Sequence, residues 1–194
     1  MEEWEEGRAI PPRHEDRVPS RRLMSQNPRF KVGDTVFYPA AGVGLIEAVE
    51  DLFLTGRRER CFVIRIHESN VTIKVPQANM ARNGIRPLLA SRELKDLFKI
   101  LAGRCQRRAS GNLLERCREL GQKVQGGSPT DLGEVVRDLT HWKSQTGLSF
   151  DELRLLETAC KYLCQEIAAV EGISPEDAYD RIQQQIGLTA GAVA

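Results

Sequence analysis

The chain has 194 residues, of which 41% are hydrophobic and 28% are charged. This composition is ordinary for a globular protein and excludes a wholly disordered chain or a collagen-like repeat. No apolar run approaches the roughly 18 residues of a membrane-spanning helix, and residues 1–23 carry charges where a secretory signal has its apolar segment. We therefore expect a cytoplasmic protein. The five cysteines are odd in number and irregularly spaced, which argues against a disulfide framework and predicts reduced thiols.

The formal net charge of +1 conceals an uneven distribution along the chain. Residues 29–103 have a net charge of +4, residues 104–127 have +4 in a much shorter stretch, and residues 128–194 have −6. Positive charge is therefore densest in 104–127, which is the first candidate for contact with a polyanion. The acidic charge of 128–194 is typical of a solvated helical face.

The first part of the chain lacks the pattern of a folded segment. Residues 1–23 mix charges of both signs with three prolines and show no apolar period, so they cannot bury enough surface to offset the entropy of ordering. We predict a flexible N-terminal arm over residues 1–28. Met24 stands where the patterned sequence begins and is an alternative translation start.

From Phe30 to Leu89 apolar residues alternate with a period of two, and Gly, Pro and Asn interrupt them. This pattern predicts strands over 34–38, 44–54, 61–67 and 70–75, with a short one near Ile85 and turns at 55–56 and 68–70. Five short strands in this span are typical of a small bent barrel of the SH3 or Tudor kind. The predicted barrel core consists of Val32, Val36, Val43, Ile46, Val49, Phe62, Ile64, Ile66 and Ile73.

After Leu89 the apolar period becomes that of helices, and cap residues mark their ends. The pattern predicts helices over 91–102, 112–125, 128–146, 149–171 and 174–185. Ser149 followed by Glu152 is a capping box. The sequence therefore predicts an α+β protein, with an SH3-like or Tudor-like barrel over 29–89 and an all-α bundle of four to five helices over 90–194.

The motifs of common enzymes are absent from the sequence: there is no Walker A loop, no GxGxxG after a strand, no HExxH and no GxSxG. Cys160 and Cys164 are one turn apart on a predicted helix and could offer two thiolates to zinc, with Cys105 and Cys117 completing the site. Without a CxxC motif, buried cysteines acting as small apolar residues are favoured. We expect no enzyme, no metal and no cofactor.

The first candidate binding surface is the strand predicted over 70–75. Val75 is followed by Pro76, which cannot donate to a strand ladder, so this strand is expected at a sheet edge. A partner's strand can pair with such an edge. Alternatively, Pro76 protects the edge from aggregation, and the pattern alone favours that interpretation.

The second candidate surface is the basic segment 104–127. Guanidinium groups suit phosphate because they present a planar fork of donors. No aromatic residue is interleaved, so base stacking is not indicated, and a charge run is more often a solvated face. The cations are Arg104, Arg107, Arg108, Arg116, Arg118 and Lys123.

Five segments together suggest a family. They are FKVGDTVFYPAAGVGLIEAVE at 30–50, CFVIRI at 61–66, VTIKVP at 71–76, GEVVRDL at 133–139, and GLS followed by a charged, Leu-rich helix at 147–156. In this order they resemble the CarD/CdnL family of bacterial RNA polymerase-binding transcription regulators. The N-terminal module of that family is similar to the polymerase-interacting domain of transcription-repair coupling factor.

The resemblance implies two contacts. The barrel is expected to dock on the β subunit of RNA polymerase, and the helical domain to contact promoter DNA at the upstream edge of the melted bubble. Lys74 keeps the basic charge that many family members place against the β subunit, which shifts VTIKVP from edge protection toward binding. The residues that fall on or beside the polymerase-contacting positions are Asp51, Leu52, Leu54, Val63, Lys74 and Pro76.

The helical part departs from the family's pattern. Members typically carry a run like NWxRRY, whose indole wedges into the minor groove. Here Asn112 falls on the Asn, Leu113 on the Trp, Glu115 and Arg116 on the two arginines, and Cys117 on the Tyr. Leucine can also unstack a base step, but leucines of an amphipathic helix more often face the core. Leu113 is therefore either a DNA wedge or a core residue.

We expect a monomeric transcription regulator that binds the polymerase β subunit through its barrel. Its helical domain is expected to act on open-complex formation through nonspecific contacts with promoter DNA. The alternative is a polymerase-tethered adaptor whose helical domain recruits another protein and does not act on DNA. The predicted DNA-binding residues are Arg104, Arg107, Arg108, Leu113, Arg116, Arg118 and Lys123.

Overall fold

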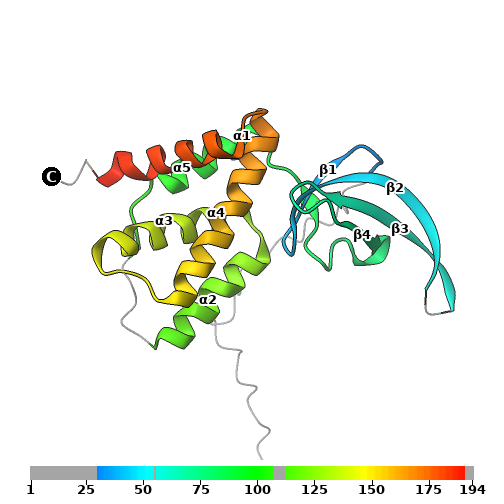
Figure 1. The fold of residues 1–194 in the computed structure, drawn as a ribbon, viewed down its shortest axis with the longest axis horizontal. Coiled ribbons are helices and arrows are strands. Elements are labelled where there is room, and N and C mark those ends of the chain that lie inside the picture. The colour runs from blue at the N-terminus through cyan, green and yellow to red at the C-terminus, as the bar shows by residue number, and fades with distance from the viewer. Residues whose placement is uncertain (1–29, 55, 107–111, 191–194) are drawn as a thin grey trace, which may run out of the picture.

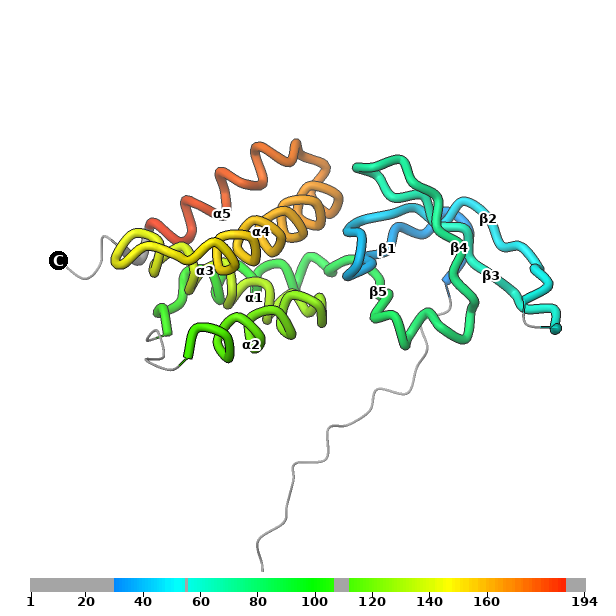
Figure 2. The backbone as a smooth tube through the Cα atoms, turned by 60° about the horizontal axis from the view of Figure 1, so that its bottom comes forward, coloured from blue at the N-terminus to red at the C-terminus, as the bar shows by residue number. Residues whose placement is uncertain are grey.

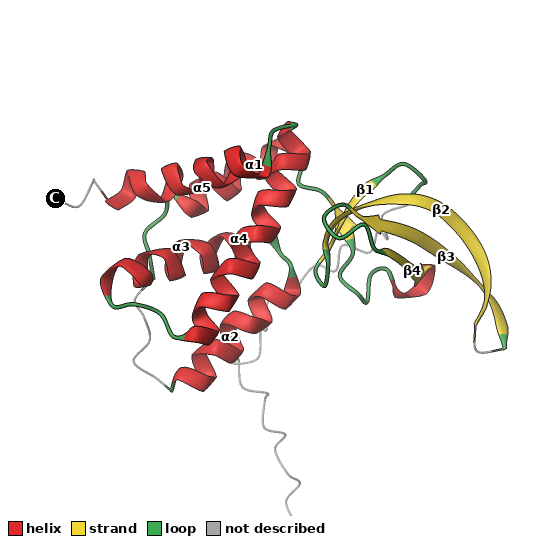
Figure 3. Ribbon diagram, in the orientation of Figure 1, coloured by secondary structure: helices red, strands yellow, loops and turns green. Residues whose placement is uncertain are grey.

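The computed structural model describes residues 30–54, 56–106 and 112–190, and the predicted arm over 1–28 lies outside them. The strands are β1 (Thr35–Tyr38), β2 (Gly42–Leu54), β3 (Arg57–Ile66), β4 (Thr72–Pro76) and β5 (Arg86–Pro87), with a 3-10 turn over Gln77–Asn79. The helices are α1 (Ser91–Leu101), α2 (Leu113–Gly126), α3 (Pro129–Gln145), α4 (Phe150–Glu171) and α5 (Pro175–Ala190). The α+β class is confirmed, with a curved sheet beside a helical bundle (Figures 1 and 3).

The strands form one antiparallel sheet in the order β4-β3-β2-β1-β5. The bent, barrel-like sheet is open within the described residues, because β4 and β5 end it on opposite sides and do not pair with each other. β5 is only two residues long and contains Pro87, which has no N–H to donate to a further ladder. At the other end of the sheet, β4 pairs with β3 and, within the described residues, with no other strand, so it is an edge strand, as predicted.

The buried apolar side chains form two separate clusters. The first lies within the sheet and includes Val36, Ile46, Phe62, Ile64, Ile66 and Val75. The second fills the bundle. Val32, predicted in the barrel core, is 57% exposed because it lies in the turn before β1, where strand alternation has not begun. Val43 is buried, but in the cluster of the bundle.

The sheet and the bundle pack against each other through β1 and β2. Phe37 and Val43 are register partners on these strands, and both belong to the core of the bundle. The Phe37 ring meets the ring of Tyr162 of α4 edge-on, with centroids 5.5 Å apart. Figure 2 shows β1 and β5 on the side of the sheet that faces the helices. The apolar face of the sheet near β1 is thus covered by α4.

The long helix α4 is the centre of the bundle and contacts α2, α3 and α5 as well as β2. Its fully buried residues include Ala159, Leu163 and Ile167. α1 packs on α3, where a side chain at Gly133 would bring its Cβ within 2.8 Å of Leu97 Cδ1. The glycine therefore permits the close approach of these two helices.

Local capping explains where the helices begin and end. The predicted capping box is confirmed: Glu152 N–H donates to Ser149 Oγ at 3.3 Å, and Ser149 N–H donates to Glu152 Oε2 at 2.9 Å. Asn112 caps α2 by accepting from the N–H of Leu114 at 3.1 Å. α5 extends to Ala190, beyond the predicted end at 185. Among the described residues, no helix has both the length and the apolar character needed to cross a bilayer.

Candidate functional site

The first surface, called the sheet edge, consists of β4 and the residues beside it: Lys74 and Pro76 on β4, Val63 on β3 and Glu50 on β2. Val63 pairs with Lys74 in the register of β3 and β4, and Cys61 pairs with both Pro76 and Glu50. These pairings bring Lys74, Val63 and Pro76, three of the sequence-predicted residues, to one edge of the sheet.

Side chains at the sheet edge differ in exposure. Lys74 and Glu50 are about half exposed, and Lys74 Nζ lies 2.7 Å from Glu50 Oε2. Val63 beneath them is only 6% exposed, so it supports the surface rather than presenting its own side chain. Cys61 is fully buried, and burial raises the pKa of its thiol. The edge thus offers a partner a charged pair above an apolar base.

The remaining predicted residues of this surface lie on the β2–β3 hairpin, which extends past β4 as two strands only (Figure 1). Asp51 is exposed, whereas Leu52 and Leu54 are partly buried. Phe53, between these leucines, was not among the predicted site residues and is 75% exposed. A register shift between Ile46 and Ala48 puts Val49 on the same face as the core residue Ile46. Phe53, four residues further, lies on this face too, but beyond the end of the core.

The predicted cations of the second surface are used in three ways. Arg104 and Arg118 are exposed. Arg116, in contrast, is mostly buried and donates from Nε to Glu152 Oε1 at 2.8 Å, because the fully buried Glu152 requires a partner. Lys123 pairs with Glu134 at 2.7 Å. The segment with Arg107 and Arg108 lies outside the described residues.

Apolar side chains mark the end of the bundle where α2 and α4 begin. Leu113 is 43% exposed and Leu114 76% exposed, so neither belongs to the core. Phe150, the first residue of α4, is 74% exposed. The ion pair between Arg116 and Glu152 joins the first turns of the two helices. We call Leu113, Leu114 and Phe150 the bundle end.

Leu114 and Phe150 were not predicted as surface residues. Phe150 directly follows the cap residue Ser149 and is three residues before Leu153, with which the apolar stripe of α4 begins. A spacing of three residues places Phe150 in line with this stripe, so the helical period predicts burial and the sequence gives no signal for its exposure.

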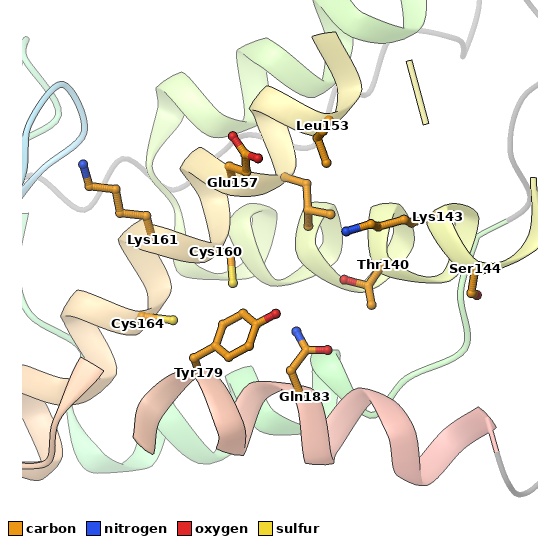
Figure 4. A pocket seen from close by; sticks show the side chains of 11 residues that line it. Thr140, Lys143, Ser144, Leu153, Glu157, Cys160, Lys161, Cys164, Tyr179 and Gln183 are labelled. Carbon is orange, nitrogen blue, oxygen red and sulfur yellow. The ribbon is translucent and has the colours of Figure 1, made fainter. Parts of the chain in front are cut away.

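The cysteines are all free thiols and do not gather at one place. Cys160 and Cys164 line a cleft of about 770 Å³ between α3, α4 and α5, together with Tyr179 (Figure 4). A hydrogen bond from Cys164 lowers the pKa of Cys160, and the pKa of Cys164 is raised by the same contact and by burial. Cys117 lines a different cavity, beside Asp151. In the described residues, no three His, Cys, Asp or Glu side chains are placed to hold a metal ion.

Two family models match successive parts of the chain. Residues 30–89 match the model of the CarD-like/TRCF RID domain, and residues 96–183 match the model of the CarD C-terminal domain. The chain is 31% identical over 148 residues to a protein of Bacillus subtilis (strain 168) named "Putative transcription factor YdeB", covering 75% of this chain and 94% of that relative. The chain therefore belongs to the CarD family of transcription regulators.

Proposed function

We propose that the protein binds the β subunit of RNA polymerase through the sheet edge and acts on promoter open complexes through nonspecific DNA contacts of its helical domain. It carries out no catalysis in this role and works as a monomer in the bacterial cytoplasm. The polymerase-binding residues are Lys74 and Pro76, supported by Val63, with Asp51, Leu52 and Leu54 of the hairpin beside them.

The observation that carries the proposal is the exposed charged pair at the edge of the sheet that matches the RID model. Lys74 and Glu50 are side by side on the surface, where a surface ion pair contributes little to folding. An acidic group of a partner can therefore replace Glu50 at small cost. The backbone groups of β4 that do not face β3 are available for pairing with a strand of the partner.

The proposed DNA contact combines cations with exposed apolar side chains. Arg104 and Arg118 neutralise phosphates, which supplies affinity without sequence information. Leu113 is exposed at the start of α2, as an apolar wedge between base steps must be. Arg116 is excluded from this set, because it is committed to Glu152 inside the bundle.

The test is an in vitro transcription experiment with purified polymerase and the full chain. We expect the protein to change the lifetime of the open complex, and Lys74→Glu to shift this effect to higher protein concentrations, because the substitution weakens docking on the β subunit. Binding to an isolated β lobe measured in parallel separates docking from the later step. An unchanged lifetime despite tight β binding would contradict the action on DNA.

A second function is favoured by the composition of the bundle end. Leu113, Leu114 and Phe150 are apolar, and the neighbouring Glu115 and Asp151 are acidic and exposed. This combination also suits a protein partner, in which case the chain is a polymerase-tethered adaptor. The salt dependence of DNA affinity distinguishes the two functions, since phosphate contacts make affinity fall steeply with salt and an adaptor has no such slope.

A further inference from the structure

Arg86 of β5 and Glu166 of α4 form an ion pair between the sheet and the bundle. Arg86 Nη1 donates to Glu166 Oε1 at 2.5 Å, and Nη2 donates to Oε2 at 2.8 Å, so the guanidinium holds the carboxylate with two parallel hydrogen bonds. The N–H of Leu89, just before α1, donates to Glu166 Oε1 at 3.0 Å. Glu166 is fully buried and Arg86 is mostly buried. The Glu166 carboxylate thus binds both Arg86 and Leu89, which lie on the segment that joins the sheet to the bundle.

The same guanidinium also binds the junction of α2 and α3. Nε and Nη2 of Arg86 donate to the carbonyl oxygen of Gly127 at 3.1 and 2.9 Å. Gly127 has φ of 64°, and a Cβ there would lie 2.6 Å from Pro39 Cγ and 2.9 Å from Phe37 Cε1. Arg86 Cζ lies 4.4 Å from the centroid of the Phe37 ring. We call Arg86, Glu166, Gly127 and Phe37 the clasp.

A second polar contact between sheet and bundle is of a different kind. Glu68, in the turn after β3, accepts from Lys161 Nζ at 2.8 Å and from Gln165 Nε2 at 2.6 Å. Glu68 and Lys161 are both half exposed. Water and salt screen such a pair, so it places little constraint on the two modules. It serves as a matched control for the clasp, because it joins the same two modules.

The ion pair of the clasp is better suited to fixing an orientation than to adding stability. Taking both charges out of water costs about as much as their attraction returns, and apolar residues of similar volume often hold such a site equally well. Apolar contacts tolerate rotation, whereas a planar fork on a carboxylate fits in one orientation. The directional contacts of the clasp therefore restrict how the bundle can turn on the sheet.

We propose that Arg86 and Glu166 are positioning residues that set the angle between the sheet and the bundle. The inference rests on the proposed function: with the sheet edge on polymerase, this angle determines where the bundle end meets DNA. Figures 1 and 2 show the β2–β3 hairpin and the start of α2 at opposite sides of the molecule. A small rotation at the clasp is therefore a large displacement at the bundle end.

The first experiment measures the angle in the free protein, without polymerase or DNA. Residual dipolar couplings report whether the sheet and the bundle share one molecular alignment. We expect one alignment for the unchanged chain and for Glu68→Gln, and two different alignments for Arg86→Met combined with Glu166→Leu. If the double variant fails to fold, Arg86→Lys, which keeps the charge but loses the planar fork, gives a smaller difference in the same direction. A single alignment in these variants, within error, would overturn the proposal.

The second experiment measures how the angle between the sheet and the bundle affects the lifetime of the open complex. The double variant should bind the β lobe and DNA separately as the unchanged chain does, while its effect on open-complex lifetime falls at least about 5-fold, the lower end of typical coupling between two binding events. The single variant Arg86→Lys, in which Glu166 is intact, should keep part of the effect on open-complex lifetime. An undiminished effect together with two alignments would show that the angle is not used. If the unchanged chain has no effect on open complexes, the proposed function fails, and the dipolar couplings still decide whether the clasp sets the angle.

Discussion

The sheet edge and the start of α2 both carry cations in the sequence, but they use them differently. At the sheet edge, Lys74 keeps its ammonium group at the surface beside the exposed Glu50. At the start of α2, Arg116 turns inward to the fully buried Glu152. The first cation is available to a partner, and the second holds two helices together.

This difference shows that a count of charges does not tell where the charges act. A surface pair can be opened by a partner at little cost, because water already solvates both groups. A buried pair cannot, because withdrawing one group leaves the other charged in a poorly solvated place. The basic segment 104–127 therefore presents fewer cations than its composition suggests, and its exposed helix start is formed by Leu113 and Leu114.

The largest effect is expected from breaking the internal pair. Arg116→Ala removes the ion pair that Arg116 makes with the buried Glu152 and should lower the free energy of unfolding by about 3–5 kcal/mol. Urea denaturation measures this loss. The control is Arg118→Ala on the same helix, where the side chain is exposed and the change should stay within about 0.5 kcal/mol. Equal effects of the two substitutions would contradict the internal role of Arg116.

A smaller effect is expected at the sheet edge, and on binding rather than folding. Lys74→Glu places a second acid beside Glu50 and should weaken binding to the β subunit by about 1–3 kcal/mol, since the contact is charge-paired and partly desolvated in the complex. Titration of the full chain with a β-lobe fragment measures the change. Lys99→Glu, on α1, removes another exposed ion pair and should leave the affinity unchanged. Unchanged affinity in folded Lys74→Glu protein would remove the sheet edge from the interface.

A still smaller change is expected for a single phosphate contact. Arg118→Ala should reduce the slope of log affinity against log salt by about one, because one counterion fewer is released from the DNA. The loss should be similar for all DNA sequences. Fluorescence anisotropy with duplex DNA over a range of salt concentrations measures the slope, with Lys99→Ala as the control. An unchanged slope for Arg118→Ala would leave this cation outside the DNA surface.

Most of the fold could be predicted because its signals are local. The capping box of Ser149 and Glu152 marks the start of α4 in the sequence and in the structure. The burial of Phe37 and Val43 in the bundle could not be predicted, because alternation along a strand shows that a face is apolar but not what covers it. The open sheet likewise depends on where the chain goes after Pro76.

Contacts in the candidate site could be predicted only where both residues lie on neighbouring strands of the sheet. The pairing of Val63 with Lys74 follows from adjacent strands joined by a short turn. Glu152, the partner of Arg116, is 36 residues away along the chain and on another helix, so no local sequence pattern predicts this ion pair. The clasp between Arg86 and Glu166 was missed for the same reason, since its residues are 80 positions apart.

The last prediction concerns the exposed start of α2 and has the smallest expected effect on stability. Leu113 is 43% exposed, so Leu113→Trp requires no space in the core and should change the free energy of unfolding by no more than about 0.5 kcal/mol. An indole at this position is a larger wedge between base steps. We therefore expect a longer open-complex lifetime, with duplex affinity and its salt slope nearly unchanged, because the phosphate contacts are the same.

The control is Leu114→Trp, which adds the same side chain at a more exposed position about 100° around the helix. If insertion at a defined place lengthens the lifetime, Leu113→Trp acts and Leu114→Trp does not. If both act equally, general apolar attraction to DNA explains the result and the wedge position is not specific. If neither acts while both proteins remain folded and bound to the β subunit, the bundle end does not enter DNA. Its exposed leucines then favour a protein partner, and the adaptor function becomes the better account of the helical domain.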